Sequence, residues 1–228
     1  MYAYIENTDD RSTYTCMQSN LAMKVNTVEK LLLLVLVTFS AHHVVVVCSS
    51  SFLHGNDTDR LSLLDFKDAI SLDPQQAFMS WNDSTHFCNW EGVLCTVKAP
   101  RRVVSLNLTS RGLVGQISPS LGNLTFLDSL VLTVNTLAGD IPTTLGHLHH
   151  LQTLRLNNNT LQGRIPSFAN CSKLKELDVS VNNLVGQFPG DLPPHLHMLQ
   201  VSFNNLTGII PASLGNITTL VFISCAHN

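Results

Sequence analysis

Leucines recur along residues 103–228 in a pattern that repeats every 22 to 24 residues. Each copy reads L-x-x-L-x-L and continues as N-x-L-x-G-x-I-P, as in "LQTLRLNNNTLQGRIPSFANCSK". Alternation of leucine with polar residues predicts a short strand in each copy, with the leucines facing inward. Because no single copy can bury its own apolar side, the copies must stack around one continuous core. The pattern predicts an α/β solenoid, a right-handed superhelix with a parallel sheet on its concave face. Residues 103–228 hold five such repeats and the start of a sixth.

An asparagine falls at the same point of successive repeats, directly after each predicted strand. These residues are Asn135, Asn159, Asn182 and Asn204. An amide carries donors and an acceptor, so it can satisfy backbone groups where each strand turns a corner. Glycine and proline follow at fixed positions, where we expect glycine to allow a tight bend and proline to fix the backbone beyond it.

A different pattern precedes the repeats, over residues 56–100. Apolar spacing in "DTDRLSLLDFKDAISLDP" predicts a helix that starts near Asp57 and is stopped by Asp73-Pro74. In "FCNWEGVLC", Cys88 and Cys95 enclose a tryptophan and a glycine, a spacing that does not suit a lone metal site. Since the first turn of a solenoid exposes its core edge unless it is covered, residues 56–100 are predicted to form an N-terminal cap.

The strongest apolar run follows Lys30, and small residues come directly after it. A basic flank, an apolar block and small residues predict a secretory signal within residues 23–51. The run nearly reaches spanning length, so an uncleaved membrane anchor stays open beside a cleaved signal peptide. Residues 1–22 are polar and are predicted to form a poorly ordered extension, with the true start open between Met1 and Met23. A chain with such a signal is expected in the apoplast or at the plasma membrane.

These motifs resemble a known family. L-x-G-x-I-P resembles the plant-specific class of leucine-rich repeats, and "SWN" with C-x-W-x-G-V-x-C resembles the N-terminal cap of plant receptor-like kinases and receptor-like proteins. The resemblance implies a receptor ectodomain, truncated before a membrane helix and kinase, with a disulfide between Cys88 and Cys95. Closing so short a loop contributes about 2.5 kcal/mol in a secreted chain.

Charge and composition narrow the classes of partner. Only 13% of residues are charged and the net charge is −3, which argues against a nucleic-acid binder. Asn-x-Ser/Thr sites for N-linked glycans are frequent, which fits an extracellular chain. They are Asn56, Asn82, Asn107, Asn123, Asn158, Asn170, Asn205 and Asn216.

Motifs for catalysis, cofactors or metals do not emerge from the sequence. Phosphate loops, nucleophile elbows and kinase signatures are absent, so we expect no enzyme activity and no cofactor. The histidine clusters "HLHH" and "HLH" lie between repeats, where solvated turn residues are expected rather than metal ligands.

A solenoid offers a surface instead. Outward residues of the predicted strands combine charged, polar and apolar side chains, a mixture suited to a peptide or protein. The ligand-face candidates are Val131, Thr133, Arg155, Asn157, Glu176, Asp178, Met198 and Gln200, flanked by Val134, Asn158, Val181 and Phe203. We therefore expect non-catalytic extracellular recognition in defence or developmental signalling, with a peptide, a protein or a membrane receptor kinase as partner.

Several alternatives stay open at this point. They are a secreted inhibitor of a cell-wall-degrading enzyme, a co-receptor-like module, a non-functional gene remnant, and a strand face without a ligand. The last repeat is predicted to present an uncovered apolar edge that allows self-association. That edge comprises Leu206, Ile210, Leu214, Leu220 and Ile223.

Overall fold

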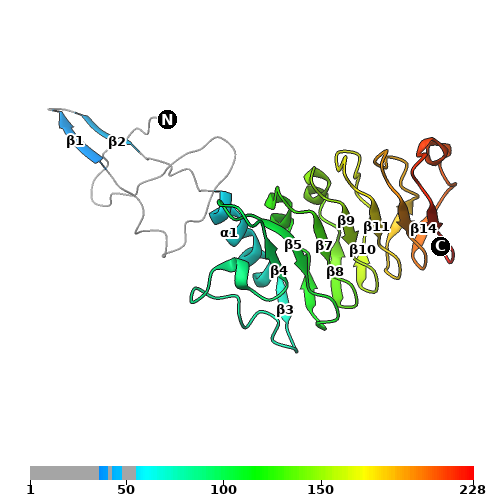
Figure 1. Cartoon of the computed structure of the whole chain (residues 1–228), viewed down its shortest axis with the longest axis horizontal. Helices are drawn as coiled ribbons and strands as arrows, with labels where there is room; N and C mark the ends of the chain where they lie inside the picture. Colours follow the sequence, from blue (N-terminus) through cyan, green and yellow to red (C-terminus); the bar gives the residue numbers. More distant parts are fainter. Residues whose placement is uncertain (1–35, 41–42, 48–54) are drawn as a thin grey trace, which may run out of the picture. The chain divides into compact units, whose positions relative to one another are not determined.

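The computed structural model describes residues 36–40, 43–47 and 55–228 (Figure 1). The chain divides into two units, residues 1–52 and residues 53–228.

The first unit contains two described strands. β1 (Leu36–Ser40) and β2 (His43–Val47) pair antiparallel. The predicted extension over residues 1–22 and most of the predicted signal over residues 23–51 lie outside the described residues, so both stay predictions. Among the helices that the structure describes, none is long and apolar enough to cross a membrane.

The second unit is built on a seven-stranded main sheet, ordered β15-β13-β11-β9-β7-β5-β4. One parallel strand comes from each repeat, and successive strands pair through equivalent leucines, such as Leu130 with Leu154. These leucines are fully buried, so the stacked core that the leucine pattern predicts is confirmed. The parallel strands are β5 (Val103–Asn107), β7 (Ser129–Val131), β9 (Thr153–Arg155), β11 (Glu176–Asp178), β13 (Met198–Gln200) and β15 (Phe222–Ser224).

A second sheet runs along the other edge of the repeats, where the sequence predicted tight bends. The repeat glycines lie within these short strands or directly after them; Gly139, for example, has φ +78° within β8. A side chain there would strain the backbone and press on Gln116 of the preceding repeat. The predicted need for glycine at this position is therefore confirmed, but the glycine belongs to a strand rather than to a tight bend. The strands are β3 (Ile70–Leu72), β6 (Val114–Gln116), β8 (Thr136–Asp140) and β10 (Thr160–Gln162), and a separate pair is β12 (Val185–Gln187) with β14 (Asn205–Thr207).

Short 3₁₀ turns return the chain from the second sheet to the next main strand. Proline stands at the start of each turn, and a buried leucine anchors it to the core. The turns are η3 (Pro119–Asn123), η4 (Thr143–His147) and η5 (Ala212–Asn216).

The cap helix is shorter than predicted. α1 (Gly55–Asp68) begins ahead of Asp57 and ends well before Asp73. It stops because the next residues form β3, which pairs antiparallel with β6 of the second sheet. Asp73 instead accepts hydrogen bonds from the backbone N–H groups of Ala77 and Phe78, at 3.0 and 2.9 Å.

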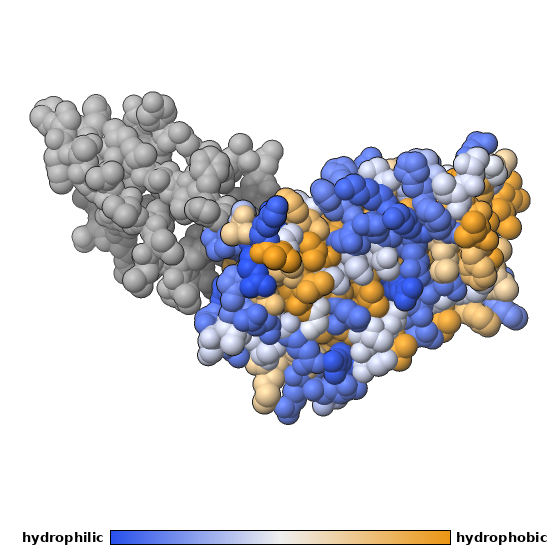
Figure 2. Space-filling view, viewed as in Figure 1, coloured by the Kyte–Doolittle hydropathy of each residue, from blue (hydrophilic) through white to orange (hydrophobic). Residues whose placement is uncertain are grey.

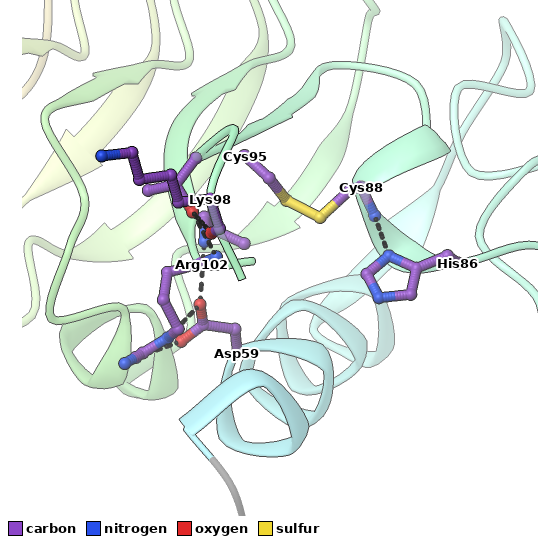
Figure 3. The surroundings of a disulfide bond; sticks show 8 residues. Asp59, His86, Cys88, Cys95, Lys98 and Arg102 are labelled. Atoms are coloured by element: carbon purple, nitrogen blue, oxygen red, sulfur yellow. Dashed lines mark hydrogen bonds and ion pairs between the residues drawn. A yellow bond between two sulfur atoms is a disulfide. The ribbon is translucent and has the colours of Figure 1, made fainter. Parts of the chain in front are cut away.

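The predicted disulfide between Cys88 and Cys95 is confirmed (Figure 3). It joins the short turn η2 (Phe87–Asn89) to β4 (Val93–Cys95), and β4 pairs antiparallel with β5. The cap thus adds an antiparallel strand to the first edge of both sheets. Since an unpaired edge exposes backbone donors and acceptors, this arrangement closes the start of the solenoid.

An ion pair fastens α1 to the first repeat. Figure 3 shows Asp59 of α1 directed at Arg102, which stands just before β5. The fully buried carboxylate accepts from Nε and Nη2 of Arg102 at 2.9 and 2.7 Å, and from the backbone N–H of Val103 at 2.8 Å. This ion pair is one of several polar links between the cap and the repeats; another ion pair joins Glu91 of the cap to Arg111.

The far edge of the repeats is only partly as expected. Leu206 and Leu214, predicted to be uncovered, are buried with 7% of their surface exposed. They are buried because they pack into the same core as the leucines of the preceding repeats. Figure 2 shows the apolar surface at the C-terminal end of the solenoid, and its exposed large side chains are Ile209, Ile210, Val221, Phe222 and Ile223.

Candidate functional site

The asparagine ladder lines the border of the main sheet. Asn159 shows its pattern: Oδ1 accepts from the backbone N–H of Leu137, and Nδ2 donates to the carbonyls of Leu132 and Leu156, all at 3.0 Å. The amide therefore ties its own repeat to the preceding one. Asn135, Asn182 and Asn204 make equivalent contacts.

The residue just before each ladder position has a left-handed backbone, with φ between 54° and 58°. We call these residues the rim row: Ser110, Val134, Asn158, Val181, Phe203 and His227. A β-branched residue at positive φ is a genuine outlier, and no pattern in the sequence predicted it. Val134, Val181 and Phe203 are exposed, so the rim row places apolar side chains beside the outer face of the main sheet.

An ion pair lies at the centre of that outer face. Arg155 donates from Nε and Nη2 to the two carboxylate oxygens of Glu176, at 2.7 and 2.9 Å. The hydrogen bond to Glu176 raises the pKa of Arg155 above its ordinary value. Both residues were predicted ligand-face candidates, and the structure brings them together across β9 and β11.

Other ligand-face candidates are less accessible to a ligand than their outward position on the strands suggested. Asp178 has only 7% of its surface exposed, because it accepts from the backbone N–H and hydroxyl of Ser180 and from the amide of Gln200. Thr133 is similarly buried and donates to the hydroxyl of Thr109. Val131, Met198 and Gln200 are half-buried. The free part of the face is therefore narrower than the sequence implied.

Asn157 is the exception in this tightly bonded surface. Its Oδ1 atom is buried and has no hydrogen-bond partner within the described part of the chain. Leaving such an acceptor unpaired costs about 1–3 kcal/mol. It lies in the same repeat as Arg155 and next to Asn158 of the rim row, so an unused acceptor stands beside the ion pair and the apolar rim.

The predicted glycan sites fall on several surfaces. Asn107 lies in β5 and Asn158 in the rim row, so both border the outer face of the main sheet. Asn123 and Asn216 end the turns η3 and η5. Asn56 is the second residue of α1, Asn205 begins β14, and Asn82 and Asn170 lie in loops. All of the glycan sites are exposed except Asn56, which is half-buried. Glycosylation itself stays a prediction.

The free cysteines and the potential metal ligands were also predicted to have no functional role, and the structure describes their surroundings. Cys171 is fully buried, and burial raises the pKa of its thiol to about 11, whereas Cys225 is half-buried. Among the residues that the structure describes, no three histidine, cysteine, aspartate or glutamate side chains gather as a metal site requires.

Comparison with known families agrees with this architecture. The leucine rich repeat N-terminal domain matches residues 56–96, leucine rich repeats in two copies match residues 149–193, and one further leucine rich repeat matches residues 195–217. The parallel-sheet solenoid with this cap matches the solved structures of plant leucine-rich-repeat ectodomains. The chain belongs to the family of plant leucine-rich-repeat receptor ectodomains, as its motifs predicted.

Individual relatives show how similar this chain is to named members of the family. The LRR receptor-like serine/threonine-protein kinase EFR of Arabidopsis thaliana is 49% identical over 73 residues, which cover 32% of this chain and 7% of EFR. Matches to such curated relatives span only 6 to 10% of the relatives' own length. They fall on the ectodomain and leave the kinase unmatched.

Two solved Arabidopsis structures show the same fold. The HAESA ectodomain, in complex with an IDA peptide hormone ligand, is 37% identical with a TM-score of 0.66, and the match covers 76% of this chain and 29% of HAESA. A chain of the BIR3–SERK2 complex is 35% identical with a TM-score of 0.63, and the match covers 72% of this chain and 92% of that one.

Proposed function

We propose that the protein is a non-catalytic extracellular recognition module that binds a peptide or a protein across the outer face of its main sheet. The observation that carries the proposal is the buried, unpartnered Oδ1 atom of Asn157, which lies beside the Arg155–Glu176 ion pair. The Asn157 side chain as a whole is only half-buried, so a change of its rotamer brings that oxygen to the surface, where a peptide N–H group can donate to it.

The surroundings of Asn157 suit the rest of a peptide. Val181 and Phe203 of the rim row offer apolar contact, and aromatic side chains are enriched where proteins recognise one another. The ion pair can reorganise to meet a charged terminus or side chain of the ligand, since Arg155 is half exposed. The HAESA and BIR3–SERK2 structures support a peptide and a protein partner respectively.

The proposed setting is the extracellular side of the secretory pathway. The apolar run within residues 23–51 and the frequent glycan sites support it, together with the receptor relatives. Expression of the full chain in a plant or insect cell tests this part: a glycosylated product in the medium or at the cell surface is expected. An unglycosylated product that stays in the cytosol would contradict it.

The binding proposal is tested by selecting a random displayed peptide library on the secreted protein. We expect a shared sequence motif among the selected peptides. The selected peptide should bind the Asn157→Ala variant about tenfold more weakly, because one buried hydrogen bond is lost. The thermal midpoint of this variant should not fall, since the Asn157 oxygen has no partner to lose.

Thr143→Ala provides the matched control. Thr143 is exposed and belongs to η4, away from the main sheet, so this variant should bind the peptide as the wild type does. Selection without any shared motif, or equal affinity of wild type and the Asn157 variant, would refute the proposal.

A further inference from the structure

Three consecutive asparagines of the third repeat have three different surroundings. Asn157 carries the unpaired oxygen, and Asn159 is the buried ladder residue whose amide bonds three backbone groups. Asn158 stands between them in the rim row, and its side chain is exposed. It is the one rim-row residue that belongs to an acceptor sequence for N-linked glycans, Asn158-Asn159-Thr160.

The backbone holds Asn158 between its two neighbouring repeats. Its N–H group donates to the carbonyl of Ser180 at 3.0 Å, and its carbonyl accepts from the N–H group of Asn135 at 3.1 Å. Its φ of 57° is repeated along the rim row, so this conformation is set by the stacking of the repeats. A group attached to Asn158 therefore starts from a fixed point at the border of the outer face.

The surroundings of Asn158 overlap with the surface proposed to bind a peptide. Val134 and Val181 are its rim-row neighbours on either side, and both are exposed. Equivalent positions on neighbouring strands are about 4.8 Å apart, so a sugar at Asn158 is within reach of both valines. Asn157, with its unpaired oxygen, is the adjacent residue.

Asn107 is the other glycan site beside this face, and it is placed differently. It lies in β5, two strands away from β9 and therefore about 10 Å from the repeat of Asn157. Its Oδ1 atom accepts from the backbone N–H and the hydroxyl of Thr109, at 3.1 and 2.7 Å, which turns the side chain toward its own strand. The position beside the unpaired oxygen is therefore that of Asn158.

We propose that Asn158 carries an N-linked glycan that partly covers the recognition face and thereby sets its affinity for a peptide. In the secretory pathway, Nδ2 of Asn158 attacks the anomeric carbon of a lipid-diphosphate-linked oligosaccharide. The new N–C bond replaces the C–O bond to the diphosphate, which leaves with its electron pair, and Nδ2 releases one proton. The inference rests on the proposed function, because the glycan competes with the peptide for Val181.

Two substitutions at Thr160 separate the glycan from the asparagine that carries it. Thr160→Ala removes the acceptor sequence and Thr160→Ser keeps it, while Asn158 is unchanged in both. A peptide selected from a random displayed library on the secreted Thr160→Ala variant should bind this variant about tenfold more tightly than it binds the wild type or Thr160→Ser. The reason is that the sugar no longer covers valine surface that the peptide buries.

A second variant guards against a purely structural effect. The hydroxyl of Thr160 donates to the carbonyl of Leu137 at 2.9 Å, and alanine loses this bond. Asn158→Gly removes the glycan but keeps that hydrogen bond, and glycine adopts a positive φ freely. It should bind the selected peptide as tightly as Thr160→Ala does.

Thr218→Ala is the matched control for loss of a glycan elsewhere. Thr218 is exposed and completes the acceptor sequence of Asn216, which ends the turn η5 rather than bordering the outer face of the main sheet. This variant should bind the peptide with the affinity of the wild type.

Mass spectrometry of the secreted wild type measures whether Asn158 is glycosylated, independently of any ligand. An unmodified Asn158, or equal affinity of the peptide for the wild type, Thr160→Ala and Asn158→Gly, would overturn the inference. In the second case the proposed function still stands, provided that Asn157→Ala weakens the same peptide. Selection that yields no shared motif even on Thr160→Ala refutes the proposed function itself, and the role of the glycan with it.

Discussion

Replacing Asp59 with alanine should loosen the junction between the cap and the first repeat. The carboxylate is fully buried and accepts three hydrogen bonds, two from Arg102 and one from the backbone of Val103. Alanine leaves the guanidinium and a buried N–H group without their acceptor. The cap then keeps its apolar contacts and disulfide but loses this polar link.

The expected loss follows from the burial of the pair. Removing one partner of a buried ion pair costs about 3–5 kcal/mol. The side chain of Arg102 keeps 13% of its surface exposed and can be partly hydrated, which places the loss at about 3 kcal/mol. Asp59→Leu combined with Arg102→Met should lose much less than Asp59→Ala alone, because no buried charge is left unpaired.

Urea unfolding followed by tryptophan fluorescence measures this loss. Trp81 and Trp90 are buried in the cap and stack with ring centres 5.2 Å apart, so their emission reports on the cap itself. Asp83→Ala is the matched control, since it breaks an exposed ion pair with Arg60 and should cost less than about 1 kcal/mol. Equal losses for Asp59→Ala and Asp83→Ala would refute the reasoning.

Four further predictions concern stability and reactivity. Val181→Asn should stabilise the protein by about 1 kcal/mol in urea unfolding, because asparagine tolerates a left-handed backbone far better than valine does; a loss would contradict the strain argument. Asn182→Ala should cost at least about 3 kcal/mol, since it strands buried backbone groups of two repeats, and a midpoint near wild type would count against the ladder. Cys88→Ser should cost about 2.5 kcal/mol by the same measurement, and an unchanged midpoint would show that the loop is held otherwise. Cys171 should resist alkylation at pH 8 in the native state, because its thiol pKa is about 11. The thiol of the unfolded chain ionises at a lower pH than the native thiol, so the contribution of Cys171 to stability is full below about pH 8.5 and is lost as pH rises through about 11. Rapid alkylation of the native protein at pH 8 would contradict the raised pKa.

The repeat core was predictable because its signal is local and repeated. Leucines two residues apart, as at Leu154 and Leu156, must face the same side of a strand, and five copies leave one way to stack them. The ladder position of Asn159 followed from the same register. The cap disulfide came instead from the family resemblance, and the structure agrees with it.

The second sheet could not be predicted from the same kind of signal. Its strands are as short as "VGQ" at Val185–Gln187, with a glycine at the centre, and glycine is depleted in strands. These segments pair only because the main sheet has already fixed their register. The early end of α1 at Asp68 has the same origin, since β3 forms only where β6 is available to pair with it.

The candidate site was predicted in position but not in detail. Arg155 and Glu176 are 21 residues apart, and only the register of β9 with β11 joins them. Asp178 faces outward along its strand, yet its neighbours Ser180 and Gln200 cover it. The unpaired oxygen of Asn157 depends on what its neighbours do not offer, and no sequence rule reports that.

Hydrogen exchange of the secreted protein, with and without a selected peptide, tests the central claim most directly. The account predicts that the peptide slows exchange of backbone amides in β7, β9, β11 and β13 and in the adjoining rim row, which surround Asn157. Slowed exchange confined to the second sheet, or to the cap, would contradict the claim that the outer face of the main sheet is the recognition surface.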